Sequence, residues 1–152
     1  MDIELRTPAT PISVLAPSWF ERFKQEGYYL KYTAVATLIA GVYLHTTGLF
    51  IGRDLLLHYI FTPWFDAVLA LPMTYTAIAG WLSWRRLDYR SPWQLIVYTL
   101  LCLYMTVSVP LHIQTFLTWS TEWLRFISEG STLIILPWQL FLIVFAWRLR
   151  FK

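Results

Sequence analysis

The sequence predicts an all-α integral membrane protein in which four helices form an up-down bundle with both termini in the cytoplasm. Of its 152 residues, 57% are hydrophobic and 14% are charged, whereas a soluble domain is about 45–50% apolar and about 25% charged. Four apolar runs are long enough to cross a bilayer, which takes about 20 helical residues. Because so little polar sequence is available to cover the surface in water, we expect the chain to lie in lipid.

The four predicted spans occupy residues 28–51, 62–84, 93–118 and 126–147. They leave no room for a separate soluble domain, so 1–152 is expected to form a single membrane domain. Aromatic side chains of the kind enriched at membrane interfaces mark the ends of the spans: Tyr28, Tyr29, Tyr32, Trp64, Trp84, Trp93, Trp119, Trp123 and Trp147. Short connections between consecutive spans favour antiparallel neighbours.

Residues 1–27 form an arm before the first span. They lack the basic start, apolar core and cleavage site of a signal peptide, so we expect the arm to be retained. Ser18 and Glu21 have the spacing of a capping box. A short interfacial helix is therefore predicted from about residue 19 to Gly27. Ser91, Pro92 and Gln94 give a similar start signal for the third span.

Lys and Arg are distributed unevenly along the chain. Most lie before or at the start of the first span, between the second and third spans, or in the tail: Arg6, Arg22, Lys24, Lys31, Arg85, Arg86, Arg90, Arg148, Arg150 and Lys152. The other two connections hold one each, Arg53 and Arg125. Because cytoplasmic connections carry the excess of positive residues, we place both termini in the cytoplasm, in a bacterial-type inner membrane.

Small residues form a stripe on one face of the first span. They recur at steps of three and four, which align on a helix: Ala34, Thr37, Gly41, His45, Gly48 and Gly52. Such a stripe lets another helix approach closely, or a flat ligand lie against the backbone. We therefore predict that His45 points into the protein and that Gly41 and Gly48 leave room beside its imidazole.

Each of the other spans carries a comparable stripe with one ionisable residue: Asp66 with Ala70, Met73, Ala77 and Gly80; His112 with Met105, Ser108 and Thr115; Glu129 with Thr132, Leu136 and Gln139. At 1.5 Å per residue, these three ionisable residues and His45 lie roughly 24 to 29 Å from the cytoplasmic edge. Four polar side chains are thus predicted at one level near the outer face, below connections that hold Arg53, Asp54, His58 and Glu122.

A purely structural explanation of this layer is also open. Asp66 and Glu129 lie near the N-termini of their helices, and His45 and His112 lie toward the C-termini of theirs, as the helix dipole favours. Charge near the interface also costs less than charge at the bilayer centre. Gln139, deeper in the fourth span, is expected to form an interhelical hydrogen bond.

A cofactor is the first functional interpretation of the layer. Neutral imidazole is the usual axial ligand of haem iron, and His45 and His112 would lie on diagonal helices that run in the same direction. Gly41 and Gly48 would leave space for the ring of a haem b, or of a chlorophyll-type pigment held through one ligand. This interpretation predicts a b-type electron-transfer protein.

A single transition metal ion is the second interpretation, with His45, His112, Asp66 and Glu129 as ligands. An open coordination position would make such a site catalytic. Three histidines are too few for a histidine-rich di-iron oxygenase, and no Gly-x-Ser-x-Gly elbow is present. Whether the chain is an enzyme stays open, and a role without catalysis by this chain alone is favoured.

The third interpretation, which we favour, places no cofactor chemistry in the chain. The 18% aromatic content provides flat contact surfaces for helices and lipids. We therefore predict a small subunit of a larger membrane complex, and the histidine layer favours an energy-converting one, respiratory or photosynthetic. A small homo-oligomeric transporter is a further alternative. The net charge of +3 follows from membrane orientation, so nucleic acid is not an expected partner.

Overall fold

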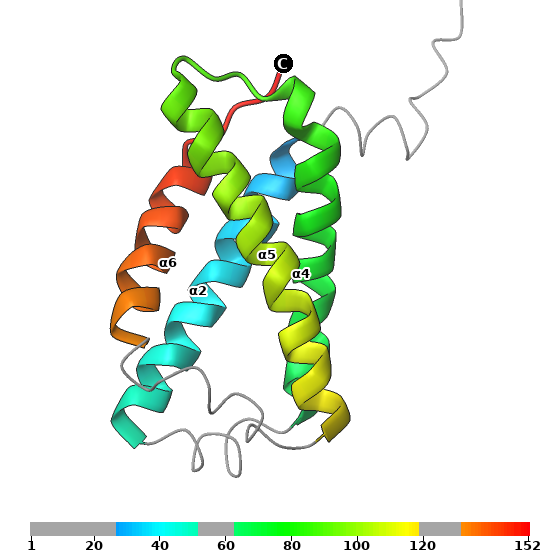
Figure 1. Cartoon of the computed structure of the whole chain (residues 1–152), viewed down its shortest axis with the longest axis vertical. Helices are drawn as coiled ribbons and strands as arrows, with labels where there is room; N and C mark the ends of the chain where they lie inside the picture. The colour runs from blue at the N-terminus through cyan, green and yellow to red at the C-terminus, as the bar shows by residue number, and fades with distance from the viewer. Residues whose placement is uncertain (1–26, 52–62, 119–131) are drawn as a thin grey trace, which may run out of the picture.

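The computed structural model describes residues 27–51, 63–118 and 132–152. Within them the chain forms four α-helices and one short 3-10 helix, in agreement with the predicted all-α class (Figure 1). The helices are α2 (Gly27–Ile51), α4 (Pro63–Ser83), α5 (Pro92–Thr118) and α6 (Thr132–Trp147), and η2 (Trp84–Arg86) follows α4. Residues 19–26 of the predicted interfacial helix, and Gly52, Arg53, Asp54, His58, Glu122 and Glu129, lie outside the described residues. Gly27, predicted to end that helix, is instead the first described residue of α2.

Three of the helices are long and apolar enough to cross a membrane: Tyr29–Phe50, Trp64–Arg86 and Pro92–Thr118. Their bounds lie close to the first three predicted spans. The described part of the fourth, α6, has 16 residues, which is shorter than the roughly 20 residues that a bilayer requires. The remainder of that predicted span, 126–131, lies outside the described residues.

The start of α5 shows how local sequence sets a helix boundary. Pro92 is the first helical residue, where its missing N–H costs no intrahelical bond. Gln94 then reaches back, and its Oε1 accepts the backbone N–H of Arg90 at 2.6 Å. In the predicted capping box, Gln94 would accept the backbone N–H of Ser91. In the structure it accepts the backbone N–H of Arg90 instead.

The helices pack as unequal pairs. α4 lies along α5, α2 lies along α6 and, less extensively, along α4, whereas α5 and α6 barely touch. Figure 1 shows α6 and α2 on one side of the molecule and α4 on the other, with α5 crossing diagonally to end beside α4. The buried core between them is mostly aliphatic, with Ala34, Leu38, Met73, Leu101, Met105 and Leu142 among its members.

The outward faces of all four helices are apolar. Phe50 is 81% exposed, Leu71 71%, Leu117 66% and Ile134 75%. Large apolar side chains exposed on every side of a domain indicate a surface that lipid or other helices cover. This arrangement agrees with the presence of three helices that are long and apolar enough to cross a membrane.

The C-terminal tail folds back on the connection between α4 and α5, which the sequence analysis did not predict. Phe151 forms an isolated antiparallel bridge with Leu87. The backbone N–H of Asp88 donates to the carbonyl of Arg150 at 2.9 Å, and that of Lys152 donates to the carbonyl of Arg86 at 2.8 Å. The tail and this connection therefore meet at one end of the molecule (Figure 1).

Candidate functional site

A short polar contact between α4 and α5 joins two of the four predicted site residues. Asp66 lies in the first turn of α4, and His112 lies near the end of α5. Nδ1 of His112 and Oδ1 of Asp66 are 2.6 Å apart. The depth argument therefore placed these two side chains correctly at one level.

The two side chains differ in exposure. The Asp66 side chain is 7% exposed, whereas that of His112 is 25% exposed. Oδ2 of Asp66 is buried and has no hydrogen-bond partner among the described residues. The pair therefore consists of a buried carboxylate with unused acceptor capacity and an imidazole that reaches the edge of the structure.

The contact fixes the orientation of the imidazole. When Asp66 is ionised, Nδ1–H of His112 donates to it, so in the neutral ring Nε2 carries the lone pair. No hydrogen bond to Nε2 occurs within the described helices. A carboxylate that orients a histidine in this way fixes the direction of the distal nitrogen, which suits it to bind a metal ion or a haem iron.

The helix ends stabilise the same pair without any ligand. Asp66 lies where the N-terminal end of α4 favours negative charge, and His112 lies toward the C-terminal end of α5, where positive charge is favoured. Next to the pair, Phe116 packs against Trp64 with ring centroids 5.2 Å apart. The structure thus supports the structural role of the pair as directly as a chemical role.

The predicted four-ligand metal site is represented only in part. Within the described residues, no three His, Cys, Asp or Glu side chains are close enough together to hold one metal ion. His45, a half-buried residue of α2, therefore does not join Asp66 and His112 in such a group. Glu129 lies outside the described residues, so its part in the site stays a prediction.

The small-residue stripe of α2 faces protein at its centre. Ala34 and Thr37 are 0% and 3% exposed, and a Cβ atom added to Gly41 would lie 2.6 Å from Nε2 of Gln139 on α6. At Gly41 the absent side chain therefore makes room for an amide of a neighbouring helix. Gly48, the other glycine of the predicted cofactor cleft, is half-buried.

Gln139 forms the interhelical hydrogen bond that the sequence predicted. Its Nε2 donates to the hydroxyl of Tyr104 on α5 at 2.5 Å, and the residue is 1% exposed. Its Oε1 has no partner among the described atoms. The sequence analysis missed Tyr104, because nothing in the spacing of an aromatic residue on an apolar helix identifies the amide that its hydroxyl will meet.

A second polar contact holds α4 to α5 at the opposite end from Asp66. The buried hydroxyl of Tyr98 donates to the carbonyl of Gly80 at 2.7 Å. A Cβ atom at Gly80 would lie 2.8 Å from Sγ of Cys102, so the backbones approach closely there. Between these ends, Nε1–H of Trp81 donates to the hydroxyl of Thr106 at 3.1 Å. Together, these contacts align α5 on α4 and so hold His112 opposite Asp66.

Comparisons of the chain with protein-family models, with curated proteins and with solved structures found no match. The functional argument therefore depends on the geometry described above.

Proposed function

We propose that the chain is a small multi-pass subunit of a larger complex in a bacterial-type inner membrane. In this proposal, four helices cross the membrane in an up-down arrangement, both termini lie on the cytoplasmic side, and the predicted N-terminal helix lies at the interface. The proposal has two parts, orientation and association, and different observations support each of them.

The charge distribution supports the orientation. Lys31, at the start of α2, lies 4.9 Å from the ring centroid of Trp147, at the end of α6. The end of α6 continues into the tail, which pairs with the connection between α4 and α5. Every Lys and Arg among the described residues thus belongs to this end of the molecule, as expected of a cytoplasmic face.

One observation carries the proposal of a complex: among the described helices, α6 is attached along one side only. It packs on α2, barely touches α5 and exposes Leu133, Ile134, Leu140 and Val144, each by more than half. Helix association in membranes depends on close packing and interhelical hydrogen bonds. α5 provides little packing beside α6. A helix of a neighbouring subunit, together with lipid, would fill that side.

Purification from native membranes tests this proposal. The full chain with an affinity tag should elute from mild detergent together with other membrane proteins at a fixed ratio, and native mass spectrometry should give the mass of that complex. A chain that elutes only as a monomer, or only as copies of itself, from membranes in which it is expressed at its natural level would contradict the proposal.

A b-type haem protein is the second candidate, because Asp66 orients His112 with Nε2 available for a ligand. An absorption spectrum of the purified protein distinguishes the two. A Soret band that is lost in both His112→Ala and His45→Ala would establish haem with these two ligands. A featureless spectrum, with the complex intact, would leave the chain as a subunit without a haem of its own.

A further inference from the structure

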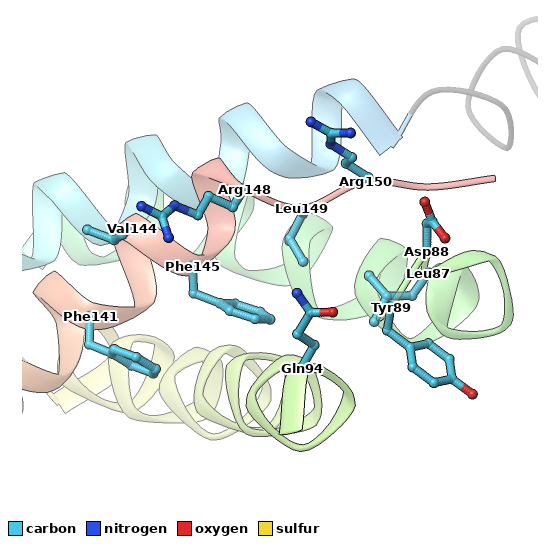
Figure 2. Close-up of a pocket in the computed structure, with 10 residues that line it drawn as sticks. All are labelled: Leu87, Asp88, Tyr89, Gln94, Phe141, Val144, Phe145, Arg148, Leu149 and Arg150. Atoms are coloured by element: carbon cyan, nitrogen blue, oxygen red, sulfur yellow. The ribbon is translucent and has the colours of Figure 1, made fainter. Parts of the chain in front are cut away.

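A pocket at the cytoplasmic end of the molecule has no part in the proposed function. It has a volume of about 180 Å³ and lies where the end of α6, the start of α5 and the connection after η2 meet. Figure 2 shows the rings of Phe141 and Phe145 on the α6 side, and on the side away from Gln94 it shows Arg148 and Arg150, whose guanidinium groups point in different directions. The pocket therefore joins a cationic rim to an apolar wall.

The rim carries positive charge on two exposed side chains, and the backbone that bears them is held in place. Arg148 and Arg150 contribute two guanidinium groups, and the one acidic lining residue, Asp88, is 3.9 Å from Nζ of Lys152. The backbone of Arg150 accepts the N–H of Asp88, so the tail cannot swing away without losing the bridge to the connection. Guanidinium groups form paired hydrogen bonds with phosphate oxygens. A phosphate is thus the anion that this rim suits.

The apolar wall continues from the pocket into the membrane. Phe141 and Val144 are 43% and 53% exposed, and they lie along the side of α6 where α5 makes few contacts. Gln94 and Tyr89 provide further polar groups at the mouth. A ligand that meets both surfaces has an anionic head at the membrane interface and a hydrocarbon tail.

We propose that this pocket binds an anionic phospholipid, with its phosphate at Arg148 and Arg150 and an acyl chain along Phe141, Val144 and Phe145 between α5 and α6. Basic pockets between membrane helices on the cytoplasmic side are suited to such head groups. The proposal rests on the proposed orientation of the chain in the membrane, and it stands whether or not the chain joins a complex.

Lipid binding to the full-length protein in detergent tests the proposal. Native mass spectrometry with added phosphatidylglycerol should show one lipid retained far more strongly than phosphatidylcholine with the same acyl chains. Because each basic residue near a membrane surface changes affinity roughly fivefold, Arg148→Gln together with Arg150→Gln should weaken phosphatidylglycerol binding roughly 25-fold. The matched control is Arg85→Gln with Arg90→Gln, which removes two exposed charges at the same end but outside the pocket; it should change binding less than twofold.

A second variant tests the acyl chain without altering charge. Val144→Trp fills the wall and should weaken phosphatidylglycerol binding tenfold or more, while far-UV circular dichroism stays helical. If the arginine double variant does not fold, two other measurements test the proposal. One is lipid binding by Val144→Trp, and the other is whether phosphatidylglycerol raises the melting temperature of the unaltered protein more than phosphatidylcholine does.

Three results would overturn the proposal. An equal loss of phosphatidylglycerol binding in the arginine double variant and in its control would mean that the lipid responds to the overall positive charge of this end and not to the pocket. Displacement of the lipid by glycerol phosphate or inorganic phosphate at equal concentration would identify a binding site for a soluble anion. Self-association that Val144→Trp abolishes, with no preference for phosphatidylglycerol, would assign the surface to a second copy of this chain.

Discussion

The two sides of α5 differ in how they meet their neighbours. Toward α4, hydrogen bonds join the helices near both ends and between them, at Tyr98, Thr106 and His112. Toward α6, the described contact is sparse, and one hydrogen bond, from Gln139 to Tyr104, crosses the gap. One helix thus has a closed side and an open side.

The difference between the two sides shows what holds helices together in a membrane, where an apolar surface can pack against lipid as well as against a neighbouring helix. Both sides of α5 are apolar, but α4 presents buried small residues, Ala70, Ala77 and Gly80, along its length. Close backbone approach and interhelical hydrogen bonds then stabilise the α4–α5 contact. We expect substitutions on the closed side to destabilise the fold most.

The largest expected effect is that of Gly80→Leu. A side chain there must displace Cys102, which is 2% exposed, and overpacking of this kind costs about 3 kcal/mol. Unfolding in mixed micelles of mild detergent and dodecyl sulfate measures the loss. Ile78→Leu, on the exposed face of the same helix, is the control and should change stability little; equal losses in the two variants would mean that the closed side is wrongly identified.

Gly41→Leu should cost less, about 2 kcal/mol, because the nearest atom is the end of a flexible side chain, Nε2 of Gln139. The variant should also break the Gln139–Tyr104 hydrogen bond and so loosen α6. The same unfolding measurement applies, and Ala36→Leu, on the exposed face of α2, serves as the control. A loss larger than that of Gly80→Leu would reverse the ranking of the two sides.

The Asp66–His112 pair should show coupling in a double-mutant cycle. His112→Leu leaves both carboxylate oxygens of a 5% exposed Asp66 without a partner, and we expect a loss of about 1–2 kcal/mol. Asp66→Leu combined with His112→Leu should cost less than the sum of the single variants, because replacing both partners leaves no buried polar group unpaired. Additive losses would show that the contact contributes nothing to stability.

The smallest effects are those of single hydroxyl groups. Tyr98→Phe removes a hydrogen bond on the closed side, and Tyr104→Phe removes the one to Gln139 on the open side. Interhelical hydrogen bonds in membranes average about 0.6 kcal/mol, and we expect each variant to lose about that amount of unfolding free energy. Hydrogen exchange should rise in α6 for Tyr104→Phe but not for Tyr98→Phe; the same pattern in both would argue against separate sides.

The sequence was sufficient to predict whatever depends on periodicity and length. It gave the bounds of α2, α4 and α5 to within a few residues, the buried face that holds Asp66 and Gly80, and a level shared by Asp66 and His112. Helical spacing determines these features because residues three or four apart share a face.

The unpredicted features depend on how helices cross. The partner of a Tyr98 or Tyr104 hydroxyl is set by the angle and offset between two helices, which no single helix encodes. The bridge between Leu87 and Phe151 joins segments on either side of two helices and shows no strand pattern. The proposed role of His45 as a cofactor ligand depends on such an arrangement too and stays a prediction.

A disulfide between α4 and α5 tests the closed side most directly. A Cβ atom at Gly80 would lie 3.9 Å from Cβ of Cys102, and disulfides join Cβ atoms about 3.8 Å apart. In Gly80→Cys, oxidation in the membrane followed by tryptic cleavage between α4 and α5, at the exposed Arg85 or Arg90, should leave two fragments that separate only on reduction. Ile78→Cys, on the exposed face, should give separate fragments throughout. Fragments of Gly80→Cys that separate without reduction would contradict the helix alignment that places His112 against Asp66.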